Sequence, residues 1–363
     1  MRAMARWVVG VTLLSVAIAG RSLAQTTYPD IKVSGRLQEQ FYYFDNDAYA
    51  ADVGPQSNIF TRRARIEARG HISENVSVYI QPSFEGGRSG LRLRDAYIDV
   101  RLSPAASASA LVLRAGQEKR PYSRYELTSS TNLPSIERGA ADGLPGDGSN
   151  DLFGSAGFLS HDVGASLRLE HSLDDDRMVT LKLGAYNGQG ESVDDVNDRK
   201  SVGARATAAL TGKIDVGASW FAHDGIVTDG LVTDSSFTNH AWDVDAQYGK
   251  PGDSGLYALV EYLQGDDDSA AKLRMRGFQG VAAYHVRMTG PNAWLYAVEP
   301  FGRVDLADPD ADTDDDGATL VTAGVGVYLS SKAWLRIAYE RQSFQAENAA
   351  SISGLRSMLS VSF

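Results

Sequence analysis

Hydropathy that alternates with a period of two, from Ile31 to the last residue, is the feature that most constrains the fold of this chain. Successive side chains of a β-strand point to opposite faces, so strict alternation predicts sheets with one apolar face. In the closing segment, one parity carries Leu359 and Val361 and the other carries Arg356. Most such segments run about nine or ten residues or more, which is longer than the strands of soluble sandwiches.

The length and number of these segments indicate a transmembrane β-barrel. A tilted strand needs about nine to eleven residues to cross a bilayer, and we count about sixteen segments, a plausible even number for a bacterial outer-membrane barrel. Short connections alternate with longer ones, which include 45–58, 117–156, 187–200, 223–239 and 305–317. With both termini in the periplasm, the sequence predicts an antiparallel all-β barrel with short periplasmic turns and long extracellular loops.

The first 24 residues have the pattern of a secretory signal peptide. Arg2 and Arg6 supply a basic start, residues 7–20 form an apolar stretch, and Ser22-Leu23-Ala24 is a small-x-small cleavage motif. We therefore expect residues 1–24 to be removed and residues 25–363 to form the barrel. Export of an acidic chain without cysteine favours the periplasm or the outer membrane of a Gram-negative bacterium.

Composition and motifs argue against several other functions. The chain has 35 Lys and Arg against 46 Asp and Glu, a formal charge of −11, so no nucleic-acid partner is expected. The absence of cysteine excludes thiolate metal sites and cysteine nucleophiles. The chain has no GxSxG, HExxH or Walker A motif, so neither catalysis nor a cofactor is predicted. A barrel hydrolase assembled from distant strands, or an adhesin, stays open as an alternative.

Basic residues on the parity opposite to the apolar one are expected to line the barrel interior. Arg63, Arg65 and Arg69 form a run along one predicted strand, opposed only by Glu67. Guanidinium groups bind oxyanions bidentately, and rings of arginine or lysine are typical of anion pores. Arg62 falls on the lipid-facing parity unless a bulge shifts the strand or the strand lies at a trimer contact. The candidate pore-lining residues are Arg36, Arg62, Arg63, Arg65, Arg69, Arg114, Lys119 and Arg124. The alternative is a lining whose charges neutralise one another.

Two connections are candidates for a functional role. The longest, residues 117–156, is predicted to fold inward as a constriction, with a surface loop as the alternative. The most acidic, residues 305–317, holds Asp312, Asp314 and Asp316, which match the start of a calcium loop. Because Ala323 stands where the loop needs a bidentate Glu, no metal site is predicted. A solvated segment, or one that meets cations bridging lipopolysaccharide, is favoured instead.

Motifs in order along nearly the whole chain resemble the phosphate-selective porin O and P family. They are Phe60-Thr-Arg62-Arg63-Ala64-Arg65, Arg94-Asp95-Ala96-Tyr97-Ile98-Asp99, Gly116-Gln-Glu-Lys119-Arg-Pro121-Tyr122, Asn187-Gly188 with Asp195, Asn197 and Lys200, Glu299-Pro300 with Arg303, and Tyr339-Glu340. The resemblance implies a homotrimer of sixteen-stranded barrels with an arginine ladder and a lysine cluster. It makes Arg62 and Arg63 the paired arginines and Lys119 the loop lysine. The chain departs from the family because only 8 of its 35 basic residues are Lys.

The sequence therefore predicts an outer-membrane porin for passive diffusion of small anions, with phosphate or other oxyanions as candidates. Outer-membrane lipid, lipopolysaccharide and small anionic solutes are its expected partners. A general or cation-leaning porin is the alternative, because an acidic mouth repels a dianion at low ionic strength.

Overall fold

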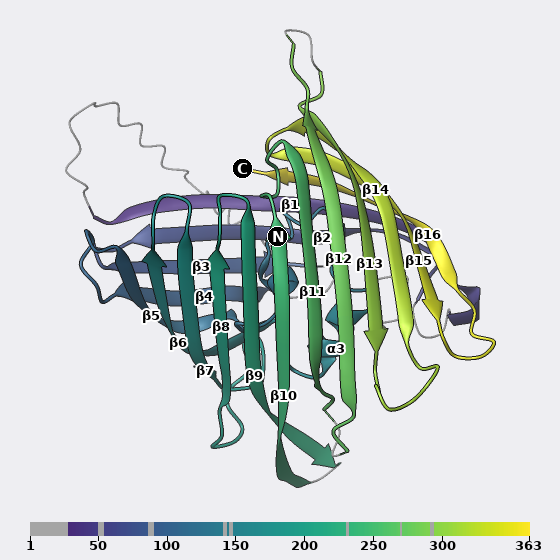
Figure 1. Cartoon of the computed structure of the whole chain (residues 1–363), viewed down its shortest axis with the longest axis horizontal. Coiled ribbons are helices and arrows are strands. Elements are labelled where there is room, and N and C mark those ends of the chain that lie inside the picture. The colour runs from purple at the N-terminus through teal and green to yellow at the C-terminus, as the bar shows by residue number, and fades with distance from the viewer. Residues whose placement is uncertain are drawn as a thin grey trace, which may run out of the picture.

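Sixteen antiparallel strands close into one barrel in the computed structural model, which confirms the predicted fold (Figure 1). Each strand pairs with its neighbours in sequence, and β1 closes the ring against β16, from Arg36 opposite Ser362 to Asp45 opposite Ser353. The strands are β1 Asp30–Asp45, β2 Ser57–His71, β3 Val76–Phe84, β4 Arg92–Arg101, β5 Ser109–Lys119, β6 His161–Ser172, β7 Met178–Tyr186, β8 Ser201–Ala209, β9 Ile214–Asp229, β10 Val232–Tyr248, β11 Gly255–Asp266, β12 Arg274–Arg287, β13 Ala297–Asp308, β14 Ala318–Ser330, β15 Ala333–Phe344 and β16 Ile352–Ser362.

The structure describes residues 28–49, 54–85, 91–140, 144, 148–229, 232–268, 271–290 and 294–363. The predicted signal peptide, residues 1–24, lies outside these residues. Helical structure is limited to η1 Asp47–Tyr49, α2 Arg124–Leu127 and α3 Ser149–Ser155 among the described residues. In the same residues, no helix has the length and apolarity needed to span a membrane.

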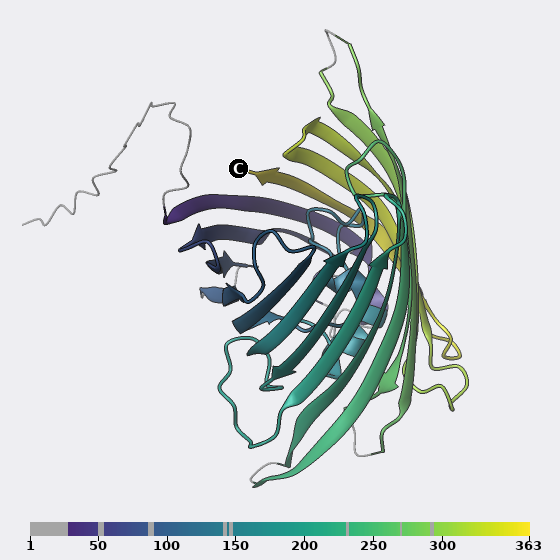
Figure 2. The same cartoon turned by 60° about the vertical axis from the view of Figure 1, so that its left-hand side comes forward.

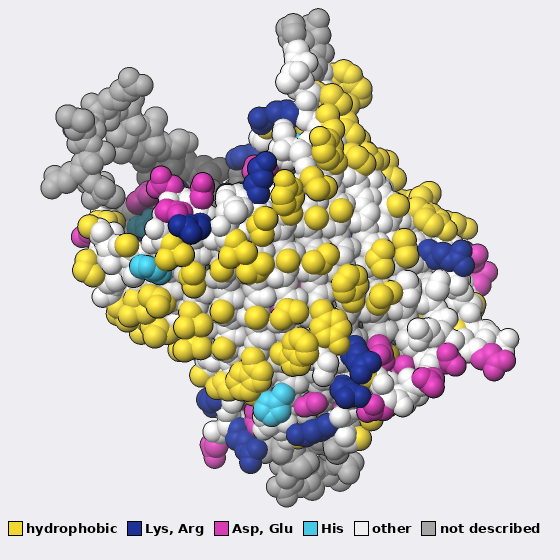
Figure 3. Space-filling model, in the orientation of Figure 1, with side chains coloured by type: hydrophobic (Ala, Val, Ile, Leu, Met, Phe, Trp, Pro, Cys, Tyr) yellow, Lys and Arg dark blue, Asp and Glu magenta, His cyan; other side chains and the backbone are white. Residues whose placement is uncertain are grey.

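The alternation of side chains sorts apolar groups outward and polar groups inward. On β16, Leu355 and Leu359 are exposed on the outside, whereas Arg356 and Ser360 are fully buried. Figure 3 shows hydrophobic side chains across the visible outer face, with charged side chains gathered toward its ends. An apolar exterior suits a lipid environment, and a polar interior suits a water-filled lumen.

One predicted loop is wrong, because residues 223–239 continue two long strands. Strands β9 and β10 pair directly across this stretch, with Asn239 opposite His223 and Phe237 opposite Gly225, and only residues 230–231 connect them. The stretch contains several β-branched and aromatic residues, which favour strands. Its Asp, Gly and Ser residues have the composition of a loop, but the ladder between the two strands satisfies the backbone polar groups.

Candidate functional site

The third loop connects β5 and β6, and its described residues, 120–140, 144 and 148–160, lie inside the barrel (Figure 2). Its apolar residues pack in three clusters against inward-facing side chains of the wall. Tyr125 and Leu133 pack with Phe301 of β13, and Phe153 and Phe158 pack with Phe221 of β9. The described part of the long connection is therefore packed against the inner face of the wall.

Polar contacts fix the start of the loop to β10 and β11. The Ser123 backbone N–H donates to Asp243 at 3.0 Å, and the Ser123 hydroxyl donates to Glu261 at 2.8 Å. Arg124 binds Asp245, so this predicted pore residue faces the loop anchor and lies away from the cavity described below. Arg205 also pairs with Asp243 (3.2 Å). The carboxylates thus have partners within the chain.

These three carboxylates, Asp243, Asp245 and Glu261, are the one group within the described residues that is close enough together to hold a metal ion. Because serine, arginine and backbone donors already satisfy them, they serve as loop anchors. The weak calcium candidates Asp312, Asp314 and Asp316 form no such group in the described residues. Asp312 instead pairs with Arg274 at 2.5 Å on the exposed connection between β13 and β14.

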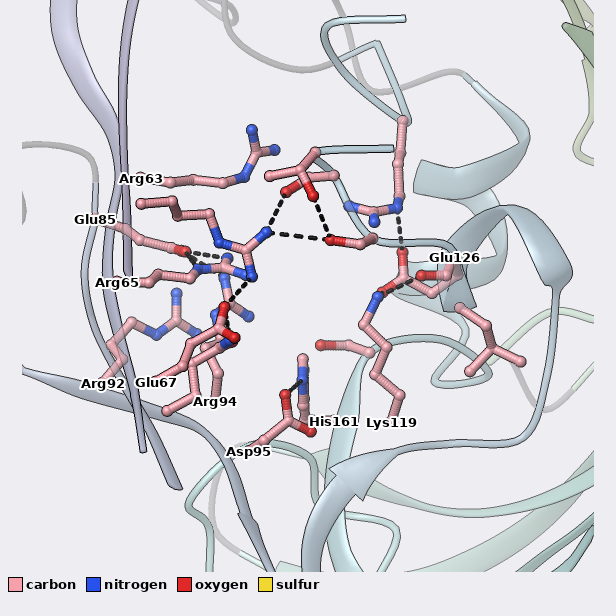
Figure 4. A pocket seen from close by; sticks show the side chains of 18 of the residues that line it. Arg63, Arg65, Glu67, Glu85, Arg92, Arg94, Asp95, Lys119, Glu126 and His161 are labelled. Atoms are coloured by element: carbon pink, nitrogen blue, oxygen red, sulfur yellow. Dashed lines mark hydrogen bonds and ion pairs between the residues drawn. The ribbon is translucent and has the colours of Figure 1, made fainter. Parts of the chain in front are cut away.

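A cavity of about 1280 Å³ remains inside the barrel, lined mainly by residues of β1–β5 and of the third loop, with a few from β6, β7, β16 and the turn between β14 and β15. Among the described residues, its lining has twelve basic and seven acidic side chains. Figure 4 shows Arg63, Arg65, Arg92 and Arg94 on the side of the cavity formed by the strands. Lys119 and Glu126 face them across the open space. Seven of the eight residues predicted from the sequence line the cavity: Arg36, Arg62, Arg63, Arg65, Arg69, Arg114 and Lys119.

A β-bulge brings Arg62 into the cavity beside Arg63. In the pairing of β1 with β2, Gln38 lies opposite Arg63 but Glu39 lies opposite Thr61, so Arg62 is the extra residue. A bulge lets two successive side chains face the same side. Both guanidinium groups reach one carboxylate, that of Glu137 in the third loop. The bulge also exchanges the inward and outward faces of β2 for the residues that precede Arg62 in the chain. Phe60 therefore packs inside the barrel near Tyr42.

Five further basic residues of the lining are not among the eight candidates, namely Arg92, Arg94, Arg138, Lys182 and Lys332. A second register shift, between Ile80 and Pro82 of β3, lets the adjacent residues Arg94 and Asp95 of β4 both line the cavity. Simple parity places only one of two adjacent residues inside. The proline at position 82 is a usable signal, because proline in a strand is confined to edges and bulges.

Carboxylates pair with most of the arginines on the side of the cavity formed by the strands. Arg36 binds Glu67 at 2.8 Å, and Arg114 binds Asp99 at 2.7 Å. Glu85 lies between two arginines, since it binds Arg65 and, at 2.5 Å, Arg94. Each pair shields part of the positive charge, but the basic groups still outnumber the acidic ones.

Arg69 differs from the other arginines of its strand. Within the part of the chain that the structure describes, it has no ion-pair partner, and its guanidinium lies 5.0 Å from the centre of the Tyr79 ring. A cation over an aromatic face keeps its donors available to a solute. Arg69 therefore offers the least encumbered guanidinium of β2.

The carboxylates of the third loop are held ionised. Glu126 lies 2.9 Å from Lys119 and 3.3 Å from Arg138. Burial alone raises the pKa of Glu126, but attraction to these two cations outweighs it and lowers the pKa to about 2. For Glu137, burial likewise raises the pKa, and attraction to Arg62 and Arg63 lowers it well below its usual range. Both loop carboxylates are negative at neutral pH.

Comparison with known proteins identifies relatives of this architecture. A family model described as "Phosphate-selective porin O and P" matches residues 31–220. No curated protein matches the chain.

Similar solved structures include the anion-selective porin from Comamonas acidovorans, at 13% identity and a TM-score of 0.61, covering 92% of this chain and 100% of that one. The outer-membrane channel DcaP of Acinetobacter baumannii has 13% identity and a TM-score of 0.61, and the match covers 92% of this chain and 97% of that one. OmpT of Vibrio cholerae, in a trimer form, has 12% identity and a TM-score of 0.55, and the match covers 92% of this chain and 99% of that one. At these identities the likeness supports the fold alone.

Proposed function

The chain belongs to the phosphate-selective porin O and P family, and on that premise we propose that it conducts small anions, oxyanions such as phosphate among them, by passive diffusion through its basic cavity. Membership of this family and the closed barrel make it an outer-membrane porin. One observation carries the anion preference. In the part of the chain that the structure describes, twelve basic and seven acidic side chains line the cavity, although the formal charge of the chain is −11.

The proposed orientation puts both termini in the periplasm. The third loop then enters the barrel from the extracellular side and narrows the lumen, and residues 1–24 direct export before their removal. The acidic connection 309–317 then lies outside, among lipopolysaccharide and its cations. The trimer form of the structurally similar OmpT supports a homotrimer as the assembly.

Anions pass through the cavity by moving between arginines that are already paired with carboxylates of the chain. Paired guanidinium groups keep free N–H donors and a net positive field, so each is a weak site rather than a trap. Conduction needs sites that bind well enough to admit an ion and weakly enough to release it. Arg69, which lacks a carboxylate partner among the described residues, is the strongest candidate for contact with the solute.

Single-channel recording in a planar bilayer tests the proposal. Phosphate added to a chloride solution is expected to reduce the chloride current by competing for the arginines. The variant Arg69→Gln is expected to weaken this block about threefold to tenfold, because it removes one charge-assisted contact. Arg177→Gln is the matched control, since Arg177 lies in an exposed turn and pairs with Asp174. Block by phosphate that is absent, or equal in all three proteins, contradicts the proposal.

A cation-leaning porin is the second candidate. It is favoured by the acidic connection between β13 and β14, where Asp310, Asp312 and Asp316 lie outside the cavity. Such a channel is expected to pass potassium better than chloride at low salt, with the preference fading as salt screens the mouth. A barrel that passes no current favours an enzyme or adhesin instead.

A further inference from the structure

Glu137 of the third loop occupies the place where a solute anion would meet the paired arginines. Arg62 donates from Nε to one carboxylate oxygen at 2.6 Å and from a terminal nitrogen to the other at 3.1 Å. Arg63 donates to the second oxygen at 3.0 Å. This two-point contact is the geometry with which guanidinium groups hold carboxylates and phosphates. A residue of the chain therefore fills the anion site.

The position of Glu137 does not depend on those arginines. Its own carbonyl oxygen accepts a hydrogen bond from Arg303 of β13 at 3.1 Å. Arg336 of β15 binds the carbonyl of Leu133, and the backbone N–H of Ala140 donates to Asp151 at 2.6 Å. The backbone of segment 133–140 is thus held by β13, by β15 and by α3 of the same loop. Removing the Glu137 carboxylate is expected to leave the loop in place.

The contact leaves the site partly charged and partly open. Two guanidinium groups share this one carboxylate, so the contact itself holds more positive than negative charge. The Glu137 side chain is 3% exposed, whereas that of Arg62 is 24% exposed and borders the cavity. A solute anion can reach Arg62 but must compete with a carboxylate that is always nearby. Tethered groups compete at effective concentrations of the order of millimolar.

We propose that Glu137 sets the affinity of the channel for anions by acting as a built-in counter-ion of Arg62 and Arg63. This inference rests on the proposed function of the cavity. The carboxylate weakens anion binding at the pair and so speeds release into the next site. Without it, two adjacent arginines hold an oxyanion tightly, and passage slows.

Single-channel recording of the isosteric variant Glu137→Gln tests this role. Phosphate is expected to block the chloride current at about tenfold lower concentration than in the wild type, because one charged competitor has been removed. The reversal potential in a KCl gradient is expected to move toward that of chloride. Glu347→Gln is the matched control, since it makes the same change in charge on the exposed connection between β15 and β16.

A second pair of variants guards against misfolding, because two guanidinium groups without a carboxylate cost stability. In the Arg63→Gln background only the more exposed guanidinium, that of Arg62, remains, and Glu137→Gln is again expected to tighten block about tenfold. If Glu137→Gln behaves like Glu347→Gln in both backgrounds, the role of Glu137 is refuted. The proposed function fails separately, if the wild type itself prefers potassium and shows no block by phosphate.

Discussion

Replacing Phe153 by alanine tests whether the third loop is held in the lumen by apolar packing. Phe153 lies on α3 and is completely buried, with its ring centroid 6.1 Å from that of Tyr122 and 6.2 Å from that of Phe158. Truncation of a buried phenylalanine costs about 3–5 kcal/mol. Because the strand ladders close the barrel without the loop, this cost falls on loop docking. Each 1.4 kcal/mol is about tenfold in an equilibrium, so the undocked population rises by about a hundredfold or more.

The matched control is Phe278→Ala on β12. Phe278 is 38% exposed on the outer face, where lipid tails replace the lost contacts. We expect Phe153→Ala to give larger and noisier single-channel currents, and to become sensitive to trypsin at loop sites such as Arg138. Phe278→Ala is expected to behave as the wild type. A Phe153→Ala channel with unchanged conductance and unchanged trypsin resistance would refute the apolar anchoring of the loop.

Two further predictions follow from the same interior. The pKa of Glu126 is lowered from 4.5 to about 2, so its ionised form stabilises the folded loop fully above about pH 4.5, and this contribution disappears as the pH falls through about 2. The difference in thermal unfolding midpoint between the wild type and Glu126→Gln is therefore expected to be constant from pH 7 to pH 5 and to shrink below; a difference that vanishes near pH 6 contradicts this. Gly116 has a φ of +129°, and an added Cβ lies 2.2 Å from the Ala96 carbonyl oxygen, so Gly116→Ala is expected to impair barrel folding, with about 1–3 kcal/mol from backbone strain alone. Gly154→Ala, where a Cβ meets nothing within 4 Å, is expected to fold normally, and heat-modifiable gel migration compares the two.

The barrel could be predicted from the sequence because the alternation that specifies its strands is visible within each strand by itself. A strand with one face toward lipid and one toward the lumen must alternate, and the pattern survives in segments such as β16 without knowledge of their partners. The prediction of a loop at 223–239 was wrong because hydrogen bonding between β9 and β10 outweighs the loop-like composition of this stretch. Pairing across strands is not visible in a single segment.

The candidate site could be predicted only in part. Parity identified Arg63, Arg65 and Arg69, but it could not place Arg62, because a bulge is a property of two paired strands. It also gave no indication that Glu137, which is 74 residues away from Arg63 in sequence, reaches the arginine pair. The packing of the third loop decides that contact, and it depends on apolar residues scattered over β1, β7 and β9 to β16.

The reversal potential of the wild-type channel in a KCl gradient tests the central claim most directly. If the basic lining of the cavity governs passage, the reversal potential lies toward the chloride equilibrium potential, and this preference persists at high salt because buried charges are weakly screened. A reversal potential that lies toward potassium, at low and at high salt alike, would contradict an anion-conducting cavity.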